Sequence, residues 1–199
     1  MTAWALVAAG LLVLVVRRGS LAVALVTGQT LLLAGIALDH AGGGDAAAAG
    51  ALAARAVGLA ALFLVLAART REPRRVVARV APLVRAGAAA ALALALTWLV
   101  PTIGLESRSA ERAVLALVAF GIATAATRRA TLFQVLGIVL VENGLVLAAL
   151  ELPGASSPAI ELGAALDLTL VALVAAVFHD RIFAEFGAGD SAALRTLRD

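Results

Sequence analysis

Residues 130–150 read ATLFQVLGIVLVENGLVLAAL, and Glu142 is the only charged residue in this apolar stretch. An α-helix rises about 1.5 Å per residue, so a helix of this length crosses the apolar core of a bilayer, which is about 30 Å thick. The stretch therefore predicts a membrane-spanning helix that carries a carboxyl group at Glu142 and a side-chain amide at Asn143.

Six further apolar segments surround this one in the chain. They are Thr2–Val16, Ser20–Leu38, Ala46–Ala68, Val80–Val100, Ala113–Thr127 and Ala159–Phe178. The chain is 63% hydrophobic and 15% charged, whereas soluble proteins are close to half apolar and about a quarter charged. We therefore expect an all-α polytopic transmembrane helix bundle of about seven spans over residues 1–178, with short first and fifth spans.

The two ends of the chain carry different signals. Residues 1–16 have no positive charge before their apolar run, and Arg17 follows it, so we expect a retained first span and not a cleaved signal peptide. Residues 179–199 form a polar tail in which Asp190 or Ser191 is suited to cap a short helix. The tail is expected either to dock through that helix or to remain solvated.

Arginines gather in alternate connections between the apolar segments. Arg17–Arg18, residues 69–75 and Arg128–Arg129 fall on one side, and the acidic connections fall on the other. Because arginine-rich loops stay in the cytoplasm, we expect the N-terminus outside and the C-terminus in the cytoplasm. Membrane orientation thus explains the formal net charge of +3 without nucleic acid as a partner. Arg85, near the start of the fourth span, is expected to extend to the cytoplasmic surface.

The charge pattern also indicates an internal repeat. Arg17–Leu21 and Arg128–Leu132 both close a short span and open a longer one that ends at an acidic residue, Asp39 or Glu151. Spans one to three would then match spans five to seven as parallel repeats. Chance similarity between alanine- and leucine-rich helices is the alternative.

Three ionisable residues are expected at a similar depth in the membrane. They are Glu142 in the sixth span, Asp167 in the seventh and Arg55 in the third. Charged groups at this depth are costly and often mark proton or ion pathways. Glu161 lies closer to the outer surface. The candidate proton-transfer residues are therefore Glu142, Asp167, Arg55 and Glu161, with Gln29, Gln134, Asn143 and Thr169 as supporting polar groups.

Two other interpretations of these charges stay open. An ion pair between Arg55 and one carboxylate would simply hold three helices together in a structural scaffold. The chain could also be an independent carrier of a small solute, with its site at mid-membrane. Classical catalytic signatures are missing from the sequence: it has no cysteine, only two distant histidines, His40 and His179, and no phosphate-binding or dinucleotide motif.

Several motifs resemble component E of hydrogenase-4 and formate hydrogenlyase-type complexes. They are RRATLFQVLG at 128–137, Glu142-Asn143-Gly144, IELG at 160–163 followed by Asp167, DSAALRTLR at 190–198, and the stretch from Arg18 to Gln29. The portion at about 113–178 is also similar to the K-type subunit of complex I and the C-type subunit of multi-subunit cation/proton antiporters. Asp167 stands where the K-type subunit has one acid, but the second acid would fall near Val139, three residues before Glu142. This departure leaves the partner of Glu142 open.

The resemblance implies a membrane-arm subunit in a bacterial inner membrane. It implies antiporter-like membrane subunits and cytoplasmic subunits similar to a group 4 [NiFe]-hydrogenase as partners. The [NiFe] centre and iron–sulfur clusters would belong to those partners, and this chain would hold no cofactor. Redox chemistry in the partners would drive translocation of protons or other cations, so this chain would be a non-catalytic subunit of an oxidoreductase complex.

Overall fold

The computed structural model describes residues 2–40, 46–70, 81–128 and 130–152, and these residues form six α-helices and no strand. The helices are α1 (Thr2–Val15), α2 (Gly19–His40), α3 (Ala46–Thr70), α4 (Pro82–Leu99), α5 (Arg108–Thr127) and α6 (Thr131–Leu150). The expected seventh span and the tail lie outside the described residues. The number of spans and the repeat therefore stay predictions.

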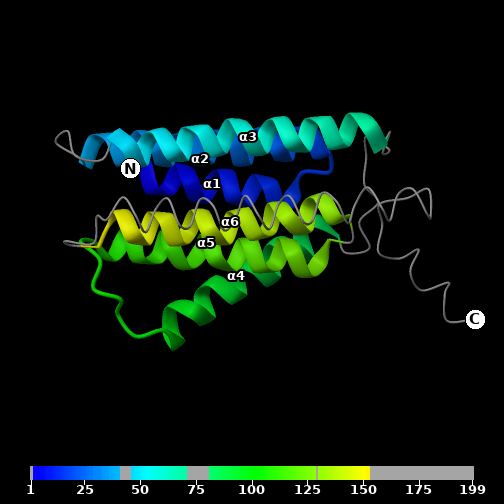
Figure 1. Ribbon diagram of the computed structural model, residues 1–199. Coiled ribbons are helices and arrows are strands. Elements are labelled where there is room, and N and C mark those ends of the chain that lie inside the picture. Colours follow the sequence, from blue (N-terminus) through cyan, green and yellow to red (C-terminus); the bar gives the residue numbers. More distant parts are fainter. Residues whose placement is uncertain (1, 41–45, 71–80, 129, 153–199) are drawn as a thin grey trace, which may run out of the picture.

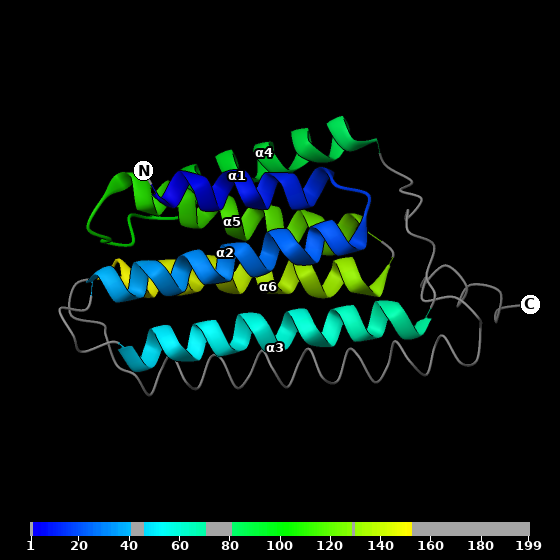
Figure 2. The same ribbon diagram turned by 90° about the horizontal axis from the view of Figure 1, so that it is seen from above.

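The six helices lie along a common direction, with successive helices antiparallel (Figure 1). α2 packs against α3 and α6, while α1 packs against α2 and α5. α4 contacts α5 and α1 and diverges from them toward its C-terminal end (Figure 1). α3 and α4 lie at opposite edges of the bundle (Figure 2). We call the end at which α1, α3 and α5 finish and α2, α4 and α6 begin the arginine end.

Four of the described helices are long and apolar enough to cross a membrane by length and composition. These are α2, α4, α5 and α6; α1 and the stretch Ala49–Val65 of α3 are shorter apolar helices. An all-helical bundle with helices of spanning length is the coarse architecture that the sequence predicted. The first apolar segment forms a short helix, as expected, since α1 ends at Val15.

The predicted short fifth span is wrong, because α5 begins at Arg108 and not at Ala113. Ser107 is extended and its side chain accepts a hydrogen bond from the amide of Ala110 at 3.0 Å, which caps the first turn. Glu111 adds an acidic charge in that turn, where the helix dipole favours it. Hydropathy missed this start because the first turn is charged.

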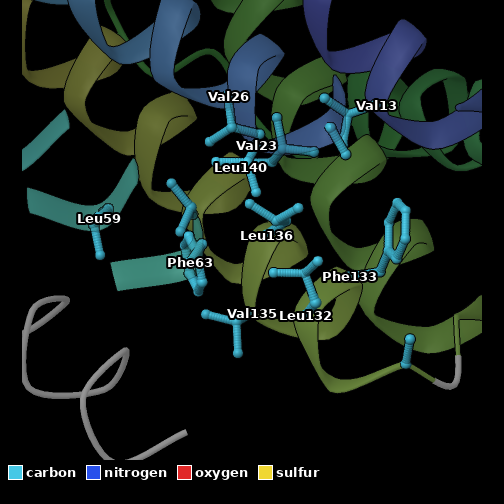
Figure 3. Packing of buried hydrophobic residues seen from close by; sticks show 13 residues of the cluster. Val13, Val23, Val26, Leu59, Phe63, Leu132, Phe133, Val135, Leu136 and Leu140 are labelled. Atoms are coloured by element: carbon cyan, nitrogen blue, oxygen red, sulfur yellow. The ribbon is translucent and has the colours of Figure 1, made fainter. Parts of the chain in front are cut away.

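Buried apolar side chains form separate clusters along the bundle. One, nearer the arginine end, joins α2, α3 and α6 through residues such as Val26, Phe63 and Leu136 (Figure 3). A second, toward the opposite end, includes Leu33 of α2 and Leu147 of α6. Buried polar side chains of α2, α3 and α6 lie between these two clusters.

Glycines bring α5 and α6 into close backbone contact. A Cβ atom placed on Gly137 would lie 2.7 Å from both the Ala125 amide nitrogen and the Gly121 carbonyl oxygen. Gly144 faces Leu117 of α5 in the same way, with 3.2 Å to its Cβ. Small residues thus let α6 approach α5 closely, and among the described helices these two make the most extensive contact.

Candidate functional site

Five polar residues meet between the two apolar clusters, near the middle of their helices. They are Gln29 and Thr30 of α2, Arg55 of α3, and Glu142 and Asn143 of α6. We call this set the polar layer. Four of its members are buried, with 5% or less of their surface exposed, and Glu142 is partly buried.

Asn143 lies at the centre of the polar layer and is fully buried. Its Nδ2 donates to Gln29 Oε1 at 2.9 Å and to Thr30 Oγ1 at 3.2 Å. Its Oδ1 accepts from Arg55 Nη2 at 3.4 Å. The amide therefore joins α2, α3 and α6, and its orientation is fixed by partners on both sides.

Gln29 extends the polar layer to a fourth helix, because its Nε2 donates to the Leu6 carbonyl of α1 at 2.8 Å. The hydroxyl of Thr30 has two acceptors within reach, the Val26 carbonyl at 3.1 Å and Asn143 Oδ1 at 3.3 Å. Since the hydroxyl carries one proton, Thr30 can switch its donation between the backbone and Asn143.

Arg55 and Glu142 form an ion pair with 2.8 Å between Nη1 and Oε1, and their side chains are 2% and 14% exposed. The contact is close, but the N–H groups of Nη1 are not aligned on the carboxylate with hydrogen-bond geometry. Which carboxylate Arg55 contacts was open from the sequence, and the structure gives Glu142. The pair lacks the bidentate geometry, with two parallel N–H···O hydrogen bonds, in which arginine binds a carboxylate most strongly.

The other predicted site residues divide into two groups. Gln134 lies at the start of α6, where its Nε2 donates to the Arg128 carbonyl at 3.2 Å. It is nine residues, or about 13 Å, from Asn143, so it does not join the polar layer. Asp167, Glu161 and Thr169 lie outside the described residues. A meeting of Asp167 with Glu142 therefore stays a prediction.

Sequence reasoning missed Thr30 as a member of the polar layer. A threonine in an apolar helix usually bonds its own helix backbone, so the residue gave no signal by itself. Thr30 joins the polar layer because it follows Gln29 on α2 and contacts Asn143 of α6. The pattern of polar residues on α2 would have pointed to it only after the contact between α2 and α6 was known.

Two arginines at the arginine end are buried, and for Arg85 the sequence-based interpretation was wrong. Arg85 is fully buried and does not extend to the surface. Arg128 is 2% exposed, and its guanidinium carbon lies 4.2 Å from the ring centre of Phe133. Its Nη2 donates to the carbonyls of Leu14, at 3.0 Å, and Val16. Arg128 thereby donates to carbonyls at the end of α1, where a helix leaves its last carbonyl groups without intrahelical partners.

A small cavity adjoins the polar layer, with a volume of about 10 Å³. Thr27 and Thr30 contribute hydroxyl groups to its wall, and Ala56, Leu59 and Val139 are among its apolar lining residues. This volume is close to the minimum for one water molecule and far below that of a solute. Within the described residues, no group of three metal-ligating side chains is found.

Comparison with protein-family models, with curated proteins and with solved structures finds no match for this chain.

Proposed function

We propose that this chain is a membrane subunit whose partly buried Glu142 takes part in proton or cation translocation within a larger redox-driven complex. The observation that carries the proposal is the Arg55–Glu142 ion pair, 2.8 Å long, which joins α3 to the middle of α6, a helix long and apolar enough to cross a bilayer. Ionisable groups at such depth are retained in membrane proteins mainly where they serve a pathway or a partner.

The surrounding geometry supports a carboxylate that exchanges its proton. Glu142 is the most exposed member of the polar layer, and its partner Arg55 contacts it without full hydrogen-bond alignment. Asn143 and Thr30 supply groups that both donate and accept, as a relay requires. The positive charge of Arg55 lowers the electrostatic cost of keeping the Glu142 carboxylate charged inside the bundle.

The motifs around Glu142-Asn143-Gly144 support a more specific proposal. The parent complex would resemble a group 4 [NiFe]-hydrogenase or a complex I-like assembly in a bacterial inner membrane. Antiporter-like subunits would lie beside this chain, and the [NiFe] and iron–sulfur cofactors would belong to cytoplasmic partners. The N-terminus would face outward and the C-terminus the cytoplasm, as the arginine-rich connections favour.

The test compares Glu142→Gln with Glu151→Gln, which removes one charge from the end of the same helix. Membrane vesicles containing the whole complex are assayed for proton movement, and complex assembly is checked by native electrophoresis. We expect Glu142→Gln to abolish proton movement in an assembled complex, while Glu151→Gln retains it. Intact proton pumping in the Glu142→Gln complex would exclude the proposed role.

A structural scaffold is the second candidate, and the ion pair itself favours it. Arg55 and Glu142 join α3 to α6, and Asn143 adds α2, so the polar layer fixes the register of these helices. A scaffold tolerates the charge-neutral double substitution Arg55→Met/Glu142→Leu with full translocation activity. A relay loses translocation in that variant even when the subunits assemble.

A further inference from the structure

Three arginines from distant parts of the chain gather at the arginine end. Arg17 lies between α1 and α2, Arg85 in the first turn of α4, and Arg128 directly after α5. Arg17 is exposed, while Arg85 and Arg128 are buried. The three are close enough for Arg17 to act electrostatically on Arg85 and on Arg128. We call them the arginine cluster.

The hydrogen bonds of Arg128 use only part of its donor capacity. Nη2 binds the two carbonyls at the end of α1, but Nε and Nη1 are buried and have no acceptor among the described residues. Burial, followed by the charges of Arg85 and Arg17, lowers the pKa of Arg128 to about 10. Arg128 therefore keeps its charge at neutral pH, in a place where a counter-charge would be strongly favourable.

The helix directions add to this positive potential. α2 begins at Gly19, α4 at Pro82 and α6 at Thr131, and all three N-termini lie at the arginine end (Figure 1). Each helix N-terminus carries a partial positive charge from its aligned peptide dipoles. The positive ends of three helix dipoles and the arginine side chains thus lie in one region. This region is therefore a candidate for binding an anion.

We propose that the arginine cluster binds the phosphate group of an acidic phospholipid. The phosphate would contact the exposed Arg17 and supply a counter-charge to the buried Arg128 behind it. The cluster lies at the ends of helices of membrane-spanning length, which is the level of lipid headgroups. Basic pockets between helix ends on the cytoplasmic side are known to take anionic headgroups.

Adjacent arginines provide a matched pair of variants. Arg17 and Arg18 are both exposed and differ by one position, but only Arg17 acts electrostatically on Arg85 and Arg128. Replacing either with glutamine removes the same charge from the same connection. Neither substitution touches the hydrogen bonds of Arg128 to α1, so both variants are expected to fold.

The experiment titrates the purified full chain, in a neutral detergent, with short-chain phosphatidylglycerol and follows the thermal midpoint. Short-chain phosphatidylcholine and inorganic phosphate are the comparison ligands. We expect phosphatidylglycerol to raise the midpoint and phosphatidylcholine to have no effect. Arg17→Gln should weaken the apparent affinity for phosphatidylglycerol about tenfold and Arg18→Gln about twofold or less.

The outcomes separate the possible sources of the phosphate. If phosphatidylglycerol acts at much lower concentration than inorganic phosphate, the lipid is the ligand. If inorganic phosphate is equally effective, a soluble anion occupies the cluster and the lipid assignment is wrong. Equal effects of Arg17→Gln and Arg18→Gln, or equal responses to the two phospholipids, would overturn the site itself.

Discussion

Arg55 and Arg128 are both buried arginines, and the bundle accommodates them in different ways. Arg55, at mid-length in α3, contacts the carboxylate of Glu142 and the amide of Asn143. Arg128, at the end of α5, lies on the ring of Phe133 and donates to backbone carbonyls of α1. The first arginine has a charged partner that can gain or lose a proton, whereas the second has partners that cannot change charge.

This difference separates two uses of a buried cation. A backbone carbonyl keeps the same polarity at all pH values, so the contacts of Arg128 suit a permanent connection between the end of α1 and α5. A carboxylate changes its interaction with arginine whenever it is protonated, so the contact between Arg55 and Glu142 suits the translocation role proposed for it. The following predictions test this contrast.

The largest effect is expected from Glu142→Leu, which leaves the charge of Arg55 buried without its partner. Removing one member of a buried pair costs about 3–5 kcal/mol, while replacing both by apolar residues is close to neutral. The free energy of unfolding in detergent micelles should therefore fall sharply in Glu142→Leu and recover in Arg55→Met/Glu142→Leu. A double variant as unstable as Glu142→Leu would show that the pair is not the dominant contact of either residue.

A smaller and more local effect is expected from Arg128→Met. The substitution removes two charge-assisted hydrogen bonds to the end of α1, and the loss is about 2 kcal/mol after relief of the repulsion from Arg85. Hydrogen exchange should accelerate in the last turn of α1. The polar layer should keep its protection, because its contacts to α1 run through Leu6. Uniform acceleration in all six helices would contradict this local role.

The contact of Arg128 with Phe133 joins the end of α5 to α6, and Gly137 tests how close approach stabilises this helix pair. A methyl group at Gly137 meets the backbone of Ala125 and Gly121, so Gly137→Ala should cost about 1–3 kcal/mol of unfolding free energy. Gly28→Ala in α2 is the matched control, since its Cβ meets no atom within 4 Å. The control should gain a few tenths of a kcal/mol or more from helix propensity. Equal losses in the two variants would mean that close approach is not what stabilises this helix pair.

The sequence predicted much of this architecture because the length of each apolar segment can be read directly along the chain. The stretches that became α2, α3, α4 and α6 were recognisable from hydropathy, with ends shifted by a few residues. The start of α5 was missed because a cap and charged residues in the first turn look like a loop to hydropathy. Depth along a helix was also predictable, since Arg55 and Glu142 were expected at a common height and do meet.

The sequence did not reveal which way side chains turn at the helix ends. Arg85 and Arg128 stand beside apolar runs, where arginine normally extends toward water. Their burial depends on how α1, α4 and α5 pack, and that arrangement brings together residues more than 40 positions apart in the sequence. Thr30 escaped notice for the same reason, because its partner Asn143 comes from a distant helix. Which helices pack against each other could not be predicted from this single sequence.

The smallest effect concerns Arg17 and reverses in sign with the lipid. Without acidic lipid, Arg17→Gln should raise the thermal midpoint slightly at low salt, because it removes one of the charges that repel Arg85 and Arg128. This gain should disappear near 1 M salt, where charges are screened within about 3 Å. Arg18→Gln should show no such gain. With phosphatidylglycerol bound, the same Arg17→Gln substitution should lower the midpoint relative to the unaltered chain, because the variant lacks the arginine that contacts the lipid phosphate. A shift of the same sign in both conditions would show that Arg17 acts on the bundle without the phosphate. The stability of the polar layer should not respond to acidic lipid, because the charge of Arg55 is already balanced by Glu142.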